Sequence, residues 1–152
     1  MRWRRLVERD EGESILMTRV LLVGGDVALL EGLAQSLAAQ GHVPTVATSL
    51  AEARELAMSD PPLVLVVNRA LASSAGADLL AIPLSAGGAR LLYRAATVPL
   101  APLLPALQRS VLADLTLPLE RHRLAALVQS LGERARATGR SLRPTPPDNR
   151  IQ

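Results

Sequence analysis

Residues 19–26 read RVLLVGGD, and this stretch decides the fold. A short run of Val and Leu closed by two glycines is typical of a strand that is buried on both faces of a parallel sheet. Asp26 then stands where the N-cap of a helix is expected, and leucines recur at helical spacing from Leu30 to Leu37 until Gly41 ends the pattern. The stretch therefore predicts a strand followed directly by an amphipathic helix.

The same alternation continues along the chain. Ser49 and Glu52 form a capping box at the start of the second helical pattern. The strands are expected at 19–23, 44–48, 63–67, 90–93 and 111–116. The helical patterns are expected at about 27–40, 50–59, 77–82, 98–110 and 119–136. Strands that alternate with helices form right-handed parallel crossovers, so the sequence predicts an α/β fold, a (βα)5 doubly wound five-stranded parallel sheet.

A length of 152 residues suits one compact domain. We expect the domain to span 18–137. Residues 1–17 are charged and aperiodic, and are predicted to be a flexible arm or the product of an upstream start codon, with Met17 as the initiator. Residues 138–152 are rich in Arg and Pro and are predicted to be a disordered tail.

Composition narrows the class of protein. Hydrophobic residues make up 49% of the chain, but Phe is absent and there is one Trp and one Tyr, so the core must be aliphatic. No apolar run approaches the roughly 20 residues of a membrane span, and we expect a cytoplasmic protein. There is no Cys, and His42 and His122, both expected at the surface, are too few for a zinc site. No metal and no cofactor are predicted.

All 17 basic residues are Arg, and many of them lie near the two ends of the chain. The terminal groups are Arg2, Arg4 and Arg5 at the start and Arg134, Arg136, Arg140, Arg143 and Arg150 at the end. Solvated tails are the favoured interpretation, because the middle of the chain has no basic stripe with interleaved aromatic residues. Binding of the tails to nucleic acid is the alternative.

Several segments in a fixed order carry a resemblance to a known family. Residues 20–26 resemble the first strand and acidic turn of bacterial response-regulator receiver domains, which have the flavodoxin/CheY-like fold. Asn68 ends the third strand ahead of residues 76–80, which resemble the loop-to-helix entry, and residues 117–119 resemble the turn after strand five. The chain is thus similar to a CheY-like receiver domain over about 18–137.

The resemblance also locates four chemical roles. Phosphoryl transfer in this family uses an acidic pair that holds a magnesium ion, an acceptor aspartate, a Ser or Thr, and a Lys. In this sequence the roles fall, in that order, on Gly24 and Gly25, on Asn68, on Arg94 or Ala95, and on Leu117. None of these side chains supplies the required group. The resemblance therefore implies a pseudo-receiver that is neither phosphorylated nor an enzyme.

The family communicates through the fourth helix, the fifth strand and the fifth helix. The corresponding candidate interaction face here includes Gln108, Arg109, Arg121 and Arg123. The leading hypothesis is a signalling module that acts on a protein partner, or as a homodimer, through this face. The alternative is an Arg-tailed nucleic-acid-binding protein with a receiver-like scaffold. An enzyme that reuses the vacant pocket, with Asn68 and Arg94 against a small molecule, ranks last.

Overall fold

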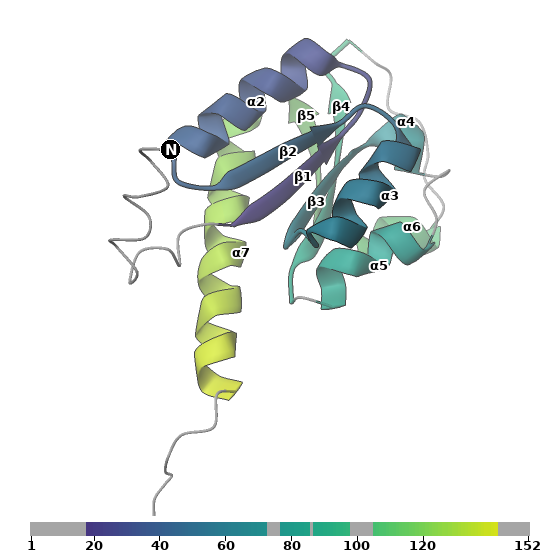
Figure 1. Cartoon of the computed structure of the whole chain (residues 1–152). Helices are drawn as coiled ribbons and strands as arrows, with labels where there is room; N and C mark the ends of the chain where they lie inside the picture. Colours follow the sequence, from purple (N-terminus) through teal and green to yellow (C-terminus); the bar gives the residue numbers. More distant parts are fainter. Residues whose placement is uncertain (1–17, 73–76, 86, 98–104, 143–152) are drawn as a thin grey trace, which may run out of the picture.

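A computed structural model describes residues 18–72, 77–85, 87–97 and 105–142. It contains a five-stranded sheet in the order β2-β1-β3-β4-β5, in which every neighbouring pair is parallel (Figure 1). The strands are β1 (Arg19–Val23), β2 (Val43–Ala47), β3 (Val64–Asn68), β4 (Ala89–Ala95) and β5 (Ala113–Leu117). The doubly wound parallel sheet predicted from the sequence is confirmed.

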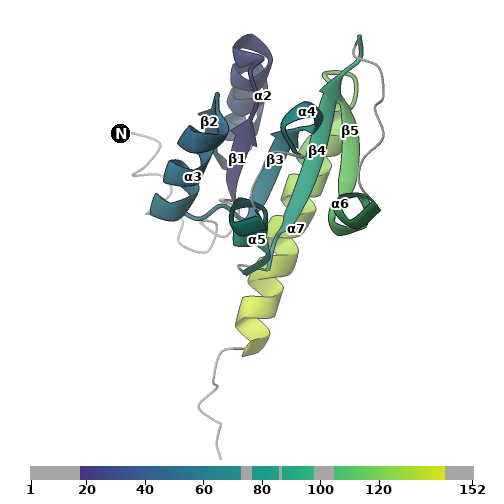
Figure 2. The same cartoon turned by 90° about the vertical axis from the view of Figure 1, so that its right-hand side faces the viewer.

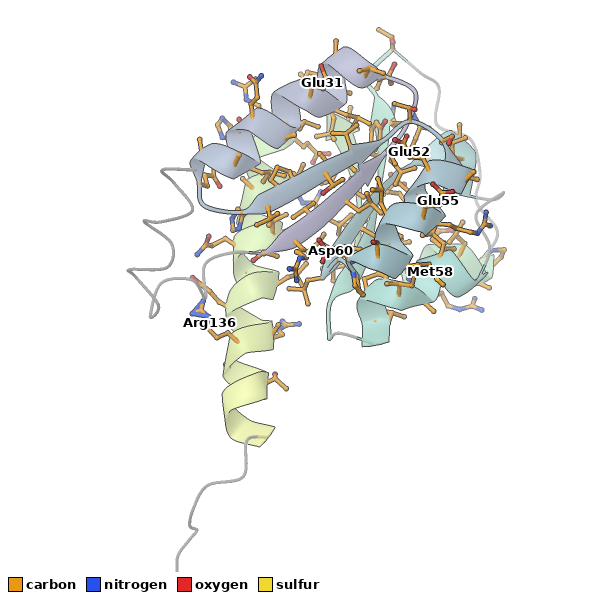
Figure 3. All side chains as sticks on the ribbon, in the orientation of Figure 1. Glu31, Glu52, Glu55, Met58, Asp60 and Arg136 are labelled. Atoms are coloured by element: carbon orange, nitrogen blue, oxygen red, sulfur yellow. The ribbon has the colours of Figure 1, made fainter. Side chains whose placement is uncertain are left out.

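Helices cover both faces of this sheet (Figure 2). They are α2 (Val27–Ala39), α3 (Leu50–Ser59), α4 (Arg69–Ala72), α5 (Ala77–Ser85), α6 (Pro105–Ser110) and α7 (Arg121–Leu142). Apolar residues of α2 and α7 pack on one face, and those of α3, α4, α5 and α6 pack on the other. The outward side of α3 carries Glu52, Glu55 and the exposed Met58, opposite its buried alanines (Figure 3).

The core consists of two aliphatic clusters separated by the sheet. Alternate residues of each strand enter opposite clusters, as the two-residue period of a strand requires. In β4, Leu92 belongs to the cluster under α3 and α5, whereas Leu91 and Tyr93 belong to the cluster under α2 and α7. Tyr93 is fully buried and is the largest side chain of the core. This alternation decides which side chains meet where the strands end.

Local signals in the sequence are partly confirmed. Ser49 accepts a hydrogen bond from the Glu52 amide at 3.1 Å, as the capping box predicts. The Glu52 carboxylate reaches back to the Thr48 amide at 2.8 Å, one residue before the cap. Asp26 occupies the N-cap of α2, as the sequence predicts, although its side chain makes no capping hydrogen bond. Its carboxylate is therefore available at the surface beside β1.

His42 is buried, and its predicted place at the surface is wrong. The reason is the geometry of the end of α2, where Gly41 adopts a φ of 93°. The amides of Gly41 and His42 donate to Ala38 and Leu37 carbonyls, which is the pattern of a Schellman motif. In that motif the residue after the glycine turns back against the last helical turn, and this burial cannot be read from polarity alone.

Two elements are longer than their sequence patterns. β4 runs two residues past Tyr93, to Ala95. α7 continues to Leu142, past the predicted domain boundary at 137, and Figure 1 shows it running beyond the sheet. Arg136 lies on this projecting part (Figure 3). Of the helices in the described part of the chain, none is long and apolar enough to cross a membrane.

Candidate functional site

Side chains from three neighbouring strands meet where those strands end. Val23 of β1 is the register partner of Val67 of β3, and Asn68 is the partner of Tyr93 on β4. Gly24, which follows β1, therefore lies beside Asn68. The alternation of the strands turns Asn68 and Tyr93 to the same face of the sheet. Gly24, Asn68 and Tyr93, which we call the edge triad, form a continuous row at the carboxyl edge.

Asn68 is held by two hydrogen bonds. Its Oδ1 accepts from the Ala70 amide at 2.8 Å, at the point where β3 turns into α4. Its Nδ2 donates to the Tyr93 hydroxyl at 3.4 Å. The first contact is the turn-forming role expected of an Asn at the start of a loop, and the second links β3 to β4. Both ends of the amide are thus used inside the fold.

Gly24 leaves no room for a side chain. It is buried, and a Cβ built on its backbone would overlap the Tyr93 hydroxyl oxygen. The same Cβ would stand 3.1 Å from Tyr93 Cζ and 3.3 Å from Asn68 Cβ. Gly25, by contrast, is exposed, and a Cβ there meets nothing within 4 Å. The two adjacent glycines therefore have different roles, although the sequence presents them as equivalents.

The Tyr93 phenol is a weaker acid than a free tyrosine. Burial is the main reason that its pKa lies above the ordinary value of 10.0, and the negative charge of Asp26 raises the pKa further. The hydrogen bond from Asn68 opposes both effects but does not reverse them. At neutral pH the group is therefore a neutral hydroxyl, which makes it a poor nucleophile.

The other predicted site residues divide between the two faces of the sheet. Ala95 is the register partner of Leu117, and both lie on the face of the edge triad, one step further along the sheet. Arg94 belongs to the face of Leu92, so its side chain points away from the face of Asn68. Its positive charge acts instead on Glu120, whose pKa it helps to lower.

Glu120 orders the turn between β5 and α7. Its carboxylate accepts from the Thr116 amide at 2.7 Å and from Arg123 at 3.1 Å. These hydrogen bonds, with that from Thr116 first, place the pKa of Glu120 below its ordinary value of 4.5. The turn also contains the Leu117–Pro118 peptide bond, which is cis.

A shallow hollow of ≈ 570 Å³ opens beside the edge triad. Its lining includes Asp26, Val27, Ala95, Thr97, Leu117 and Pro118. Most of this lining is apolar, and neither Asn68 nor Arg94 takes part in it. The enzyme hypothesis required a small molecule held by Asn68 and Arg94, and the opposite orientations of these two residues give it no support.

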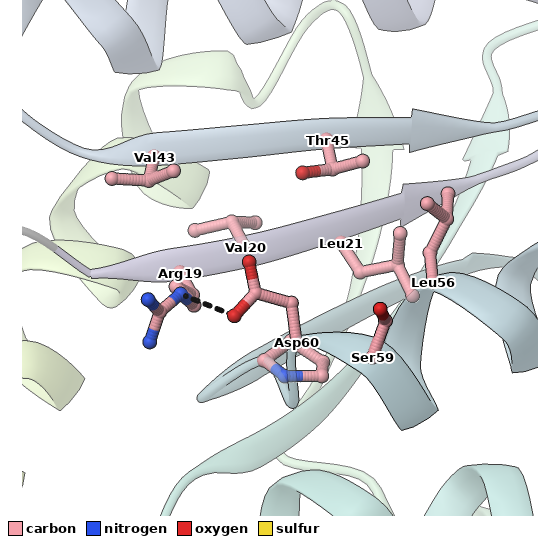
Figure 4. A pocket seen from close by; sticks show the side chains of 9 residues that line it. Arg19, Val20, Leu21, Val43, Thr45, Leu56, Ser59 and Asp60 are labelled. Atoms are coloured by element: carbon pink, nitrogen blue, oxygen red, sulfur yellow. Dashed lines mark ion pairs between the residues drawn. The ribbon is translucent and has the colours of Figure 1, made fainter.

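A second hollow of ≈ 170 Å³ lies at the opposite edge of the sheet (Figure 4). It opens between the starts of β1 and β2 and the end of α3. The Arg19–Asp60 ion pair, at 3.2 Å, crosses it, and more than half of each side chain is exposed. This is an ordinary solvated pair, which stabilises little and builds no enclosed site.

The candidate interaction face flanks β5, which is an edge strand of the sheet. Gln108 and Arg109 are exposed on α6, and Arg121 and Arg123 are exposed on α7. Two leucines at the ends of β5 are also exposed, Leu112 at 51% and Leu119 at 73%. The face therefore combines basic and apolar groups around an edge strand.

Tyr93 is the site residue that sequence reasoning missed. The apolar strand pattern ends at this residue, so the expected site residues of this strand are the next two, Arg94 and Ala95. Two signals were present: Tyr93 is the chain's one tyrosine, and it ends an apolar run whose period points it into the core. Its contact with Gly24 depends on the register of β1, β3 and β4, which no local pattern specifies.

Comparisons with known proteins agree with this architecture. No family model matches the sequence, and no curated protein does. The structure is similar to the signal receiver domain of a putative Luxo repressor protein from Vibrio parahaemolyticus, with a TM-score of 0.65, 19% identity, and coverage of 84% of this chain and 99% of that one. It is also similar to a response regulator receiver domain from Clostridium thermocellum (TM-score 0.63, 14% identity, 80% and 99% covered).

A CheY-like receiver domain from Methanospirillum hungatei gives a TM-score of 0.63 at 19% identity, with 80% of this chain and 98% of that one covered. These likenesses show that the chain has the receiver fold. The carboxyl edge of such a sheet is the edge at which ligands of open α/β folds bind. The edge triad and the hollow beside it are therefore the candidate functional site.

The edge triad does not fit the magnesium ion that the fold implies. Magnesium prefers carboxylate and water oxygens in near-octahedral geometry. Gly24 offers no donor, and Asn68 already directs its Oδ1 to the Ala70 amide. Within the described residues there is no cluster of three or more His, Cys, Asp or Glu side chains that could hold a metal.

Proposed function

We propose that this protein is a pseudo-receiver, a signalling module of the response-regulator type that is not phosphorylated and acts by binding a protein partner. The observation that carries the proposal is the edge triad. On a receiver fold, Gly24 and Asn68 replace the carboxylates that the resemblance implies, and the hydroxyl of a buried tyrosine lies against both positions. A module of this kind transmits through its shape and surface.

The chemistry of the edge supports an absence of phosphorylation. The Asn68 amide carries no negative charge and is a poor nucleophile. The Tyr93 phenol is buried, and its raised pKa keeps the proton on it. Leu117, at the expected lysine position, is buried and apolar and cannot neutralise a phosphoryl oxygen. Each of the implied roles would have to be restored before transfer could proceed.

The test of this step is the intact mass of the unmodified chain after incubation with excess acetyl phosphate and magnesium. We expect no gain of a phosphoryl group, and no change in the nuclear magnetic resonance spectrum on addition of magnesium and beryllofluoride. A phosphoryl adduct, or shifts clustered around Asn68, would overturn the proposal.

The partner is proposed to bind the face around β5. Basic groups of α6 and α7, with Leu112 and Leu119 at the two ends of β5, offer both charge and apolar area. Apolar area supplies most of the binding free energy, and basic groups speed the encounter with a partner of opposite charge. In a homodimer with two-fold symmetry, the same face of both copies would meet. The leucines of the two copies would then have to pack together while their arginines stay apart.

A charge-reversal experiment tests this face. The variant Arg109→Glu/Arg121→Glu is expected to lose capture of the partner, or to shift from dimer to monomer in size exclusion with light scattering. Arg134→Glu is the matched control, because Arg134 is also an exposed arginine of α7 but lies outside the candidate interaction face. Equal behaviour of the two variants would count against the face.

Nucleic-acid binding is the second candidate, and the projecting part of α7 is the observation that favours it. Arg134 is exposed and Arg136 partly exposed on α7, and Arg143 and Arg150 follow this helix in the sequence. Phosphate contacts release counterions, so affinity for DNA should fall steeply with salt and be weakened by Arg134→Glu. Retention on DNA that is weak and indifferent to salt would dismiss this candidate.

A further inference from the structure

The closest packing at the carboxyl edge involves a side chain that the four implied roles do not include. A Cβ on Gly24 would overlap the hydroxyl oxygen of Tyr93, whereas a Cβ on Gly25 would meet open space. The hydroxyl is therefore placed where the first atoms of a side chain at position 24 would stand. Tyr93 reaches this place from inside the core, because its register partner is Asn68 and its ring is fully buried.

We propose that Tyr93 is a plug that closes the carboxyl edge to a divalent cation, in addition to the lack of carboxylates at 24, 25 and 68. Its neutral hydroxyl lies against position 24 and beside Asn68, where the oxygens of water and carboxylates around a cation would have to stand. Rotation about the Cζ–O bond moves only the hydroxyl hydrogen. The oxygen and Cζ stay near position 24, so the space is not cleared. A carboxylate restored at position 68 would therefore face this phenol in place of a cation.

The surroundings of Tyr93 make the plug a fixed feature. The ring lies in the same cluster as Leu22, Val66 and Leu115, and its hydroxyl accepts from Asn68 Nδ2. Buried aromatic rings in close-packed cores leave their positions only at the cost of the contacts around them. Gly24 and Tyr93 therefore form one steric unit, in which the absence of a side chain at 24 is the condition for the tyrosine at 93.

The plug rests on the proposed function, because both concern the carboxyl edge of the sheet. Failure of the plug can nevertheless be told apart from failure of the proposed function. Phosphorylation is tested on the unmodified chain. The plug is tested on variants in which carboxylates have been restored. A phosphoryl adduct on the unmodified chain would overturn the proposed function, whereas equal metal binding by the variants below would overturn the plug alone.

The experiment compares Gly25→Asp/Asn68→Asp with the same variant carrying Tyr93→Leu, by isothermal titration with magnesium chloride. Position 25 accepts a side chain freely, and Asp differs little from Asn in size, so neither carboxylate creates a clash. We expect no saturable binding of magnesium while Tyr93 is present. After Tyr93→Leu we expect saturable binding, with an affinity for magnesium at least about tenfold above that of the variant that keeps Tyr93. Equal behaviour, whether both variants bind or neither does, would overturn the plug.

A second measurement keeps the proposal testable if the acidic variants do not fold. Gly24→Ala is expected to lower the thermal midpoint by several degrees, and Tyr93→Phe is expected to reduce that loss by at least half, because the overlapping oxygen is gone. The loss does not vanish, since Cζ remains at 3.1 Å from the added Cβ. Gly25→Ala is the control and should shift the midpoint little in either background. A Gly24→Ala loss that Tyr93→Phe leaves unchanged would overturn the steric unit.

Discussion

Asn68, the last residue of β3, donates a hydrogen bond through Nδ2 to the hydroxyl of Tyr93, its register partner on β4, at 3.4 Å. This contact joins a residue that the sequence singled out to one that it did not. It also couples the candidate site to the core, because the Tyr93 ring is fully buried. Substitution of Tyr93 should therefore change both the stability of the fold and the position of Asn68 at the carboxyl edge.

The titration of Tyr93 should be visible as a loss of stability in alkali. Its folded pKa lies above 10.0, so the stability it contributes is complete below pH 10.0 and is lost as pH rises from there through the folded value. The chain has no Lys, no Cys and no second Tyr, so no other side chain except Arg titrates in this range. We expect phenolate absorbance of the folded protein to appear above pH 10.0, and Tyr93→Phe to flatten the alkaline fall in thermal midpoint. An unshifted phenolate titration would contradict the burial argument.

The Arg69–Asp114 ion pair should stabilise the fold more than the Arg19–Asp60 pair. The first joins α4 to β5 at 2.9 Å, and the Arg69 side chain is only 10% exposed. Asp114→Asn should cost about 1–2 kcal/mol, between the values for exposed and buried pairs. Asp60→Asn, at a pair whose side chains are 57% and 66% exposed, should cost less than about 0.5 kcal/mol. Urea denaturation measures both, and equal losses would refute the distinction.

Two helical glycines should respond oppositely to alanine. Gly32 in α2 is exposed and a Cβ there meets nothing, so Gly32→Ala should stabilise by about 1 kcal/mol through helix propensity. Gly132 in α7 is buried, and a Cβ there would overlap the Oγ1 of the buried Thr18. Gly132→Ala should destabilise by about 1–3 kcal/mol, and Thr18→Ala should relieve part of that loss. Thermal denaturation of Gly32→Ala, Gly132→Ala and Gly132→Ala/Thr18→Ala checks this. A stabilising effect of Gly132→Ala would contradict the close contact of α7 with Thr18.

Glu120 should contribute stability that disappears in acid. Its folded pKa lies below 4.5, so the contribution is present above pH 4.5 and is lost as pH falls through the folded value. Glu120→Gln keeps an oxygen that can accept from the Thr116 amide but removes the charge that Arg123 contacts. We expect a slightly lower thermal midpoint than that of the unmodified chain at neutral pH, and the same midpoint once pH is well below 4.5. A difference in thermal midpoint between the two proteins that stays constant over this pH range would show that the charge of Glu120 is not the cause of the difference.

The sequence by itself determined the alternation of strands and helices, and with it the α/β class. Residues 19–23 carry enough aliphatic side chains to predict a buried strand, and β1 has those bounds. Ser49 and Glu52 predict a helix start that the structure contains. These features depend on residues a few positions apart, so local periodicity and hydrogen bonding are sufficient to specify them.

Tertiary structure alone decided which residues meet at the carboxyl edge. The contact of Tyr93 with Gly24 depends on the register of three strands, and Arg94 points away from Asn68 because β4 continues past Tyr93 in the alternating pattern. The burial of His42 likewise follows from a turn against α2. A strand register arises from packing between segments far apart in the chain, so one residue of slip reverses every side chain, and local patterns cannot set it.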